Sequence, residues 1–257
     1  MLRYPVWLVG LSLLFVAAER IWPRYPAQRL LRRGWLSDLA YIVFNSEYLG
    51  VLLGLVSIRI IESFQLKRLE VGLLSTAPFW IQFIAFLLVF DFLQWSIHNL
   101  LHRVDFLWQF HKVHHSIVDL DWIGDWRFHW VEIIVYRSLL YIPAAFFGFR
   151  GDVMFWAGIV NTFVGHFAHA NLRWHIGPLR YILNSPEMHI WHHNHPDSGP
   201  VNRNFGITLS IWDWIFGTAH LPPRDPARLG FEGIESYPAQ LPGQWVRPFL
   251  TLLGRQK

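Results

Sequence analysis

The chain has 257 residues, of which 53% are hydrophobic, and it contains 15 Trp and 21 Phe. A chain this apolar for its length is typical of a membrane protein and not of a soluble domain. The absence of cysteine excludes disulfides, thiolate zinc sites and iron–sulfur clusters, and the net charge of +4 includes no Lys/Arg-rich tract of the kind that indicates a nucleic-acid partner.

Five apolar segments follow one another along the chain. The first covers residues 5–18 and resembles a signal peptide, but the sequence ERIWPRYP after it offers a poor cleavage site, so we expect an uncleaved span. The later segments, as helices, are long enough to cross or deeply enter a hydrocarbon core about 30 Å thick, as single spans or as hairpin halves. They cover residues 39–60, 79–97, 133–149 and 153–170. The sequence therefore predicts an all-α, integral membrane helical bundle.

Arginines in the loop after the first segment predict the orientation of the bundle. The positive-inside rule places this loop in the cytoplasm and the amino terminus outside. If 39–60 crosses outward and 79–97 returns, residues 98–130 emerge in the cytoplasm, and the hairpin at 133–170 brings the chain back there. All dense histidine clusters then lie on the cytoplasmic side. The arginines are Arg20, Arg24, Arg29, Arg32 and Arg33.

The chain from about residue 171 mixes Pro, Gly, Asn and charged residues with short apolar runs. This pattern predicts a cytoplasmic helical cap that lies against the membrane and carries a poly-histidine dimetal site. We divide the chain into a membrane-anchoring region at 1–80, a catalytic domain with the histidine motifs at 81–220, and a cytoplasmic tail at 221–257.

Three histidine motifs, HNLLH, HKVHH and HIWHH, have helical spacing. On a helix, the offsets of three and four residues bring imidazoles onto one face about 5–6 Å apart, so that neighbours can share a metal. One tetrahedral zinc needs four ligands, whereas eight to ten neutral nitrogens suit two ions with five or six ligands each. The count therefore predicts a dinuclear centre with catalytic ligands His98, His102, His111, His114, His115, His189, His192 and His193.

The remaining histidines differ in whether they have a partner at helical spacing. His166 and His169 in GHFAHAN lie one helical turn apart, and we expect both to bind metal. His129 lies between the clusters and either binds metal or orients a ligand. His175, His195 and His220 have no partner at helical spacing, so hydrogen-bonded structural roles are expected for them.

Asp91 lies in an apolar segment seven residues before His98, on nearly the same helical face. A carboxylate at that depth needs a partner. We expect it to accept the free ring N–H of a ligand histidine, which fixes the tautomer of that ring. Glu132 and Glu187 could act in the same way.

In these motifs, the chain resembles the fatty acid hydroxylase/sterol desaturase superfamily of membrane di-iron enzymes. The resemblance covers roughly residues 85–220. It depends on DFLQWSIHNLLHR, FHKVHHS, RFHWVE, FAHANLRW, GPLRYILNSPEMHIWHHNH and NFGITLSIWDWIFGT, which occur in the order and spacing of that superfamily.

The resemblance implies two iron ions (Fe2+/Fe3+) held by the eight motif histidines, with His169 as a further position of the family type. It also implies a lipid substrate in the bilayer, O2 as co-substrate, and hydroxylation or desaturation of an unactivated C–H of a fatty acyl chain, sterol or alkyl lipid. Zinc can replace iron in a recombinant preparation. The sequence has no haem, flavin or iron–sulfur motif, so we expect a separate electron-transfer protein, such as a cytochrome b5-like protein, a ferredoxin or a reductase. A short, Arg-rich chain of this kind favours a bacterial inner membrane over the endoplasmic reticulum.

Three other functions remain open. A membrane zinc hydrolase also uses histidines, but HNLLH lacks the glutamate of the HExxH motif. A bis-histidine haem electron carrier needs only two to four axial histidines. A metal-binding or transport protein without catalysis usually has more spans and a repeated half.

Overall fold

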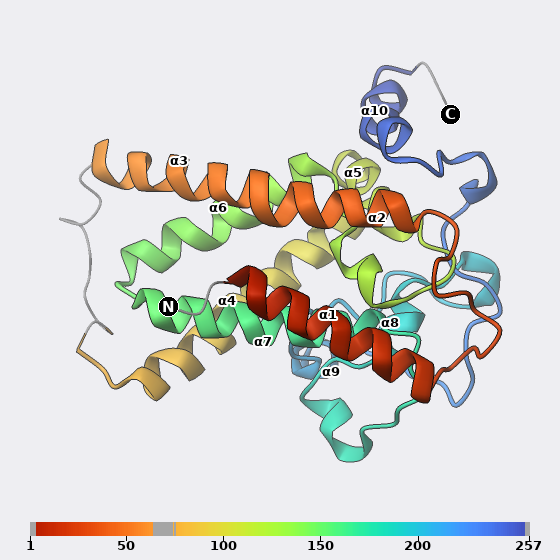
Figure 1. The fold of residues 1–257 in the computed structure, drawn as a ribbon, viewed down its shortest axis with the longest axis horizontal. Coiled ribbons are helices and arrows are strands. Elements are labelled where there is room, and N and C mark those ends of the chain that lie inside the picture. Colours follow the sequence, from red (N-terminus) through yellow and green to blue (C-terminus); the bar gives the residue numbers. More distant parts are fainter. Residues whose placement is uncertain (1–3, 64–73, 75, 255–257) are drawn as a thin grey trace.

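The computed structural model describes residues 4–63, 74 and 76–254, and helices form most of this part of the chain, which contains no β-strand (Figure 1). The all-α prediction is confirmed. The α-helices are α1 (Tyr4–Ile21), α2 (Trp35–Ile42), α3 (Gly50–Ser63), α4 (Phe79–Arg103), α5 (Asp105–His115), α6 (Trp130–Phe146), α7 (Gly151–His169), α8 (Pro186–His192), α9 (Ile211–Ile215) and α10 (Leu241–Leu252). A π-helix, Val43–Leu49, joins α2 to α3, and 3₁₀ turns lie at Trp122–Trp126, Gly177–Tyr181, Pro196–Ser198 and Ile234–Ser236.

Three helical stretches of the described chain are long and apolar enough to cross a membrane: Tyr4–Ile21, Trp35–Ile60 and Phe79–Arg103. They correspond to the first three predicted apolar segments. The other two segments form α6 and α7, of 17 and 19 residues, which are not among these three. The protein is a membrane protein, and its number of crossings stays a prediction.

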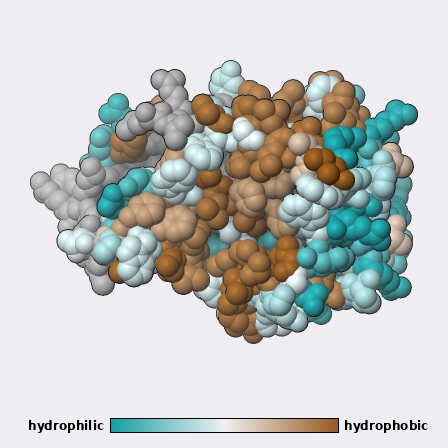
Figure 2. Space-filling view, turned by 60° about the horizontal axis from the view of Figure 1, so that its bottom comes forward, coloured by the Kyte–Doolittle hydropathy of each residue, from teal (hydrophilic) through white to brown (hydrophobic). Residues whose placement is uncertain are grey.

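The long helices lie side by side, while α8, α9 and the loops around them gather at one end (Figure 1). Helix α7 contacts both α1 and α4, and α6 contacts α3 and α4. Large apolar side chains cover the outside of the long helices, and Figure 2 shows them as a continuous brown area beside a hydrophilic end. Examples are Leu13, Val51, Leu55, Trp80 and Ile84, all at least half exposed. An apolar surface of this extent fits contact with lipid.

Two buried carboxylates attach the loop at residues 204–218 to α4. Asp213 accepts hydrogen bonds from the backbone N–H of Phe205 and Gly206 and from Nε1 of Trp95. Asp91 accepts from the backbone N–H of Thr208 and Leu209 and from Trp212 Nε1. The NFGITLSIWDWIFGT motif therefore folds around acceptors that replace water for its backbone.

The Arg-rich loop after α1 lies at the same end of the bundle as the histidine motifs. Arg24 pairs with Asp225 at 2.6 Å and donates to the carbonyl of Leu172, just beyond the end of α7. Arg32 pairs with Asp121 at 2.6 Å in the loop after α5. These contacts agree with the prediction that the loop and the histidines share one side.

The segment after residue 220 also packs on this end. Trp191 Nε1 donates to the carbonyl of Arg224, and the N–H of Gly230 donates to the carbonyl of His193. Helix α10 lies against α5 and α2. The proposed boundaries at residues 80 and 220 stay predictions.

Candidate metal centre

Nine histidines form two adjacent groups at the capped end of the bundle, where the ring nitrogens of each group lie within 4.8 Å of one another. The first group contains His98, His102, His111, His115 and His192. The second contains His114, His169, His189 and His193. All eight motif histidines and His169 are thus brought together.

Each HxxHH motif contributes to both groups. On α5, His111 and His115 are four residues apart and share the first group, while His114 turns to the second. In and just after α8, His189 and His193 share the second group, and His192 turns to the first. Because a helix places residues i and i+4 on one face and i+3 beside them, the two motifs bridge the groups. The rings of His115 and His193 stack with centroids 4.5 Å apart.

Backbone carbonyls contact the outer ring nitrogen of several histidines. His98 Nδ1 lies 2.8 Å from the carbonyl of Phe205, and His192 Nδ1 lies 2.9 Å from that of Arg203. In the second group, His169 Nδ1 lies 2.9 Å from the carbonyl of Gly165. A carbonyl only accepts, so these contacts place the proton on Nδ1 and leave the Nε2 lone pair for a metal.

Within each group, the inner Nε2 atoms face one another. His98 Nε2 lies 3.1 Å from that of His111, and His169 Nε2 lies 2.9 Å from that of His189 and 3.2 Å from that of His114. His192 Nε2 is buried and has no hydrogen-bond partner among the described residues. Converging lone pairs repel one another unless a proton or cation lies between them, so the donor set fits metal ions.

Burial keeps neutral the group histidines that lie on α5, on α8 and just after α8. It lowers the pKa of six of these residues well below the usual value, and neighbouring imidazoles lower most of them further. Neutral imidazole is the form that binds metal. These residues are His111, His114, His115, His189, His192 and His193.

The carboxylate that supports a motif histidine is Glu132, and the prediction for Asp91 was wrong. Glu132 Oε1 lies 2.8 Å from His111 Nδ1, and both side chains are buried. Among the described residues, Asp91 accepts its hydrogen bonds from the Thr208–Trp212 segment and from no histidine ring. Glu187 contacts His175, which lies outside both groups.

His166 and His129 lie outside both groups. His166 Nδ1 contacts Asp125 at 3.0 Å, and its ring packs against Phe15. His129 Nε2 lies 3.0 Å from the carbonyl of Trp245, while its Nδ1 accepts from the N–H of Val131. Both nitrogens of His129 are thus in use within the protein, as in a structural histidine. His195 and His220 also lie outside the groups.

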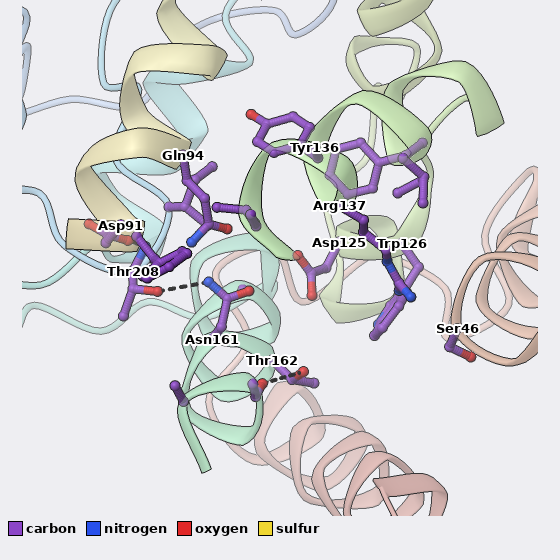
Figure 3. Close-up of a pocket in the computed structure, with 18 of the residues that line it drawn as sticks. Ser46, Asp91, Gln94, Asp125, Trp126, Tyr136, Arg137, Asn161, Thr162 and Thr208 are labelled. Carbon is purple, nitrogen blue, oxygen red and sulfur yellow. Dashed lines mark hydrogen bonds between the residues drawn. The ribbon is translucent and has the colours of Figure 1, made fainter. Parts of the chain in front are cut away.

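A cavity of about 670 Å³ extends from the histidines between α1, α3, α4, α6 and α7. Its lining is mostly apolar and includes Phe86, Leu140 and Phe155, and it reaches His98, His111, His114, His169 and His189. Polar side chains also face it, among them Gln94, Asn161 and Arg137 (Figure 3). We did not predict these from the sequence, although the arginine in the apolar run VYRSLLYIP was a usable signal.

A sequence model described as fatty acid hydroxylase matches residues 83–218, which is more than half of the chain. The chain belongs to the fatty acid hydroxylase family. The matched segment begins in α4, contains both histidine groups and ends just after α9. The resemblance noted from the motifs is confirmed.

Curated relatives are similar over the same region. Ornithine lipid hydroxylase OlsE of Rhizobium tropici is 36% identical over 57% of this chain and 44% of its own length. Alkylglycerol monooxygenase of Homo sapiens is 32% identical over 54% and 30%. Very-long-chain aldehyde decarbonylase GL1-6 of Oryza sativa subsp. japonica is 25% identical over 50% and 21%. The alignments thus cover less than half of each relative, and no solved structure matches the chain.

Proposed function

We propose that this chain is a membrane-bound oxidoreductase that uses two iron ions and O2 to oxidise an unactivated C–H of a lipid. The observation that carries the proposal is the pair of histidine groups with converging nitrogens at the inner end of an apolar cavity. Two of the three relatives are named an ornithine lipid hydroxylase and an alkylglycerol monooxygenase, and these names favour hydroxylation over desaturation.

Each group would hold one iron. Five nitrogens are available in the first group and four in the second, which leaves coordination positions for O2 on an ion that takes five or six ligands. Bound iron would supply the activation of O2. Neither group contains a carboxylate among the described residues, so imidazole nitrogens alone would hold each ion.

The protein residues would bind and orient the lipid and exclude water. The apolar lining of the cavity suits an acyl or alkyl chain, and its volume lies within the range of small-molecule sites. The overall reaction would be R–H + O2 + 2e⁻ + 2H⁺ → R–OH + H2O. The electrons would come from a separate electron-transfer protein at the capped end. The arginine-rich loop favours a cytoplasmic position for that end, in a bacterial inner membrane.

The test begins with a comparison of lipid extracts. Cells that express the wild-type chain and cells that express His192→Ala are extracted and compared by mass spectrometry. We expect a lipid with one added oxygen in the wild type alone, and purified wild-type protein that contains iron. A lipid lacking two hydrogens would make the chain a desaturase. Identical extracts, together with iron-free protein, would overturn the proposal.

A further inference from the structure

Arg137 is the only arginine or lysine among the described residues that line the cavity, and it takes no part in the histidine groups. Arg137 lies on α6, and Figure 3 shows its guanidinium close to Trp126 on the side of Ser46. Its Nη2 donates to the backbone carbonyl of Asn45 at 3.2 Å. This is its one recorded polar contact among the described residues. Because a guanidinium carries five N–H donors and a permanent charge, most of its binding capacity is unused.

The backbone makes room for this guanidinium. Gly50 begins α3, and a Cβ at that position would overlap Nη1 of Arg137. The acceptor Asn45 lies in the π-helix Val43–Leu49, and π-helical turns are frequent at functional sites. Asn45 is buried, and its Nδ2 donates to the carbonyl of Trp126. Helix α6, the π-helix and the start of α3 therefore fix where the guanidinium lies.

Helix α6 connects Arg137 to a residue that contacts the metal centre. Glu132, in the first turn of α6, contacts His111, and Arg137 follows five residues later, about 7.5 Å along the axis. Apolar side chains such as Phe86 and Leu140 surround this part of the cavity. A cation that faces an apolar cavity inside a membrane protein needs a counter-charge.

We propose that Arg137 binds the anionic head group, a carboxylate or phosphate, of an amphiphilic substrate whose chain occupies the cavity. This inference rests on the proposed function and names its substrate class. Carboxylate and phosphate oxygens match the planar fork of a guanidinium and form charge-assisted hydrogen bonds. Asp91 and Asp125 also line the cavity, but Asp91 is hydrogen-bonded to Thr208 and Asp125 to His166. Among the described residues neither carboxylate pairs with Arg137, so a neutral lipid would leave the guanidinium without an ion-pair partner.

The experiment measures lipid binding to the purified, metal-free chain in a neutral detergent. Each probe has one saturated C16 chain, and the probes are palmitate, hexadecyl phosphate and neutral 1-O-hexadecylglycerol. We expect the wild type to bind both anionic probes about tenfold more tightly than the neutral one. Equal binding of the three probes by the wild type would overturn the proposal. Displacement of hexadecyl phosphate by millimolar inorganic phosphate would also overturn it, because the site would then prefer a free anion.

Three variants assign the preference to this position. Arg137→Gln should bring the affinities for the three probes within about twofold of one another, and Arg137→Lys should keep part of the preference. Gly50→Ala displaces the guanidinium and should act like Arg137→Gln even if the latter folds poorly. Arg59→Gln is the matched control, because Arg59 lies on α3 with 84% of its side chain exposed, and it should behave like the wild type. A preference that survives both Arg137→Gln and Gly50→Ala would defeat the assignment.

This binding assay is independent of oxidation. If the wild type prefers anionic probes but contains no iron and oxidises nothing, the proposed function fails while Arg137 keeps its assignment. If lipids gain oxygen in cells but the purified chain shows no anionic preference, the proposed function stands and the assignment of Arg137 fails. Where the wild type contains iron, an unchanged iron content in Arg137→Gln shows that the metal centre has not been disturbed.

Discussion

His111 Nδ1 lies 2.8 Å from Oε1 of Glu132, while Nε2 of the same ring lies 3.1 Å from His98 Nε2. Both members of the His111–Glu132 pair are almost fully buried. The glutamate therefore determines which nitrogen of His111 faces the first group, and it connects that group to α6. A carboxylate in this position also increases the electron density on the ring, which strengthens a metal bond.

Removal of this carboxylate should weaken metal binding without removing a ligand. Glu132→Ala leaves His111 Nδ1 without its acceptor, and we expect iron affinity to fall about 10- to 100-fold. Competition with a chelator of known affinity measures this change. Glu187→Ala is the control, since that carboxylate contacts His175 outside the groups and should leave iron affinity unchanged. Equal affinities in wild type and Glu132→Ala would argue against a role for the pair in metal binding.

Removal of one histidine from each group should affect the two ions separately. His192→Ala removes a nitrogen of the first group and His114→Ala removes one of the second. We expect each variant to fall from about two irons per chain toward one, and to lose oxidation of lipid. Elemental analysis and product detection measure both effects. His175→Ala, whose side chain is 72% exposed, is the control. Full iron and normal product in either variant would contradict the ligand assignment.

The sequence predicted which histidines lie close together better than it predicted which residues form hydrogen bonds to them. The motif HKVHH predicts three histidines on one region of a helix, because the period of an α-helix is local information. The division of His114 from His111 and His115 depends on where α8 packs, which is a long-range property. Likewise, the helical face of Asp91 suggested a contact with His98, but the backbone of Thr208, 117 residues away, satisfies that carboxylate instead.

His129 and His166 show the same limit of prediction from the sequence alone. Each occurs beside a motif, and composition alone does not distinguish a ligand from a structural ring. The distinction comes from partners that are distant in sequence: the carbonyl of Trp245 for His129, and Asp125 for His166. The cavity could not be predicted from the sequence for the same reason, because residues from seven α-helices line it.

The metal-free protein should lose stability as the pH falls below about 6.5. Burial lowers the pKa of histidines such as His114 and His193 far below this value, which they regain in the unfolded chain. Below pH 6.5 the unfolded chain therefore binds more protons than the folded one, and each such histidine contributes up to about 1.4 kcal/mol per pH unit. Buried Asp213 acts in the opposite direction, because burial raises its pKa.

Thermal unfolding between pH 7.5 and 5.5 measures this dependence. We expect the midpoint of the metal-free wild type to fall with pH, and the double variant His114→Asn/His193→Asn to show a smaller fall because it lacks two of the responsible groups. A midpoint that does not change with pH in the wild type, or an identical slope in the double variant, would show that these rings are not held neutral in the folded state.

A close approach between α7 and the loop after α5 gives a last test of the second group. A Cβ at Gly165 would lie 2.5 Å from Oδ1 of Asp125, the carboxylate that contacts His166 at 3.0 Å and lies 3.6 Å from His169 Nδ1. Gly165→Ala should therefore displace Asp125, destabilise the fold by about 1–3 kcal/mol and reduce iron in the second group. Gly158→Ala is the matched control on the same helix, because nothing lies within 4 Å of its added Cβ, and it should stabilise the fold by up to about 1 kcal/mol. Denaturant unfolding and iron content measure both variants, and equal behaviour of the two would show that Asp125 does not support the metal centre.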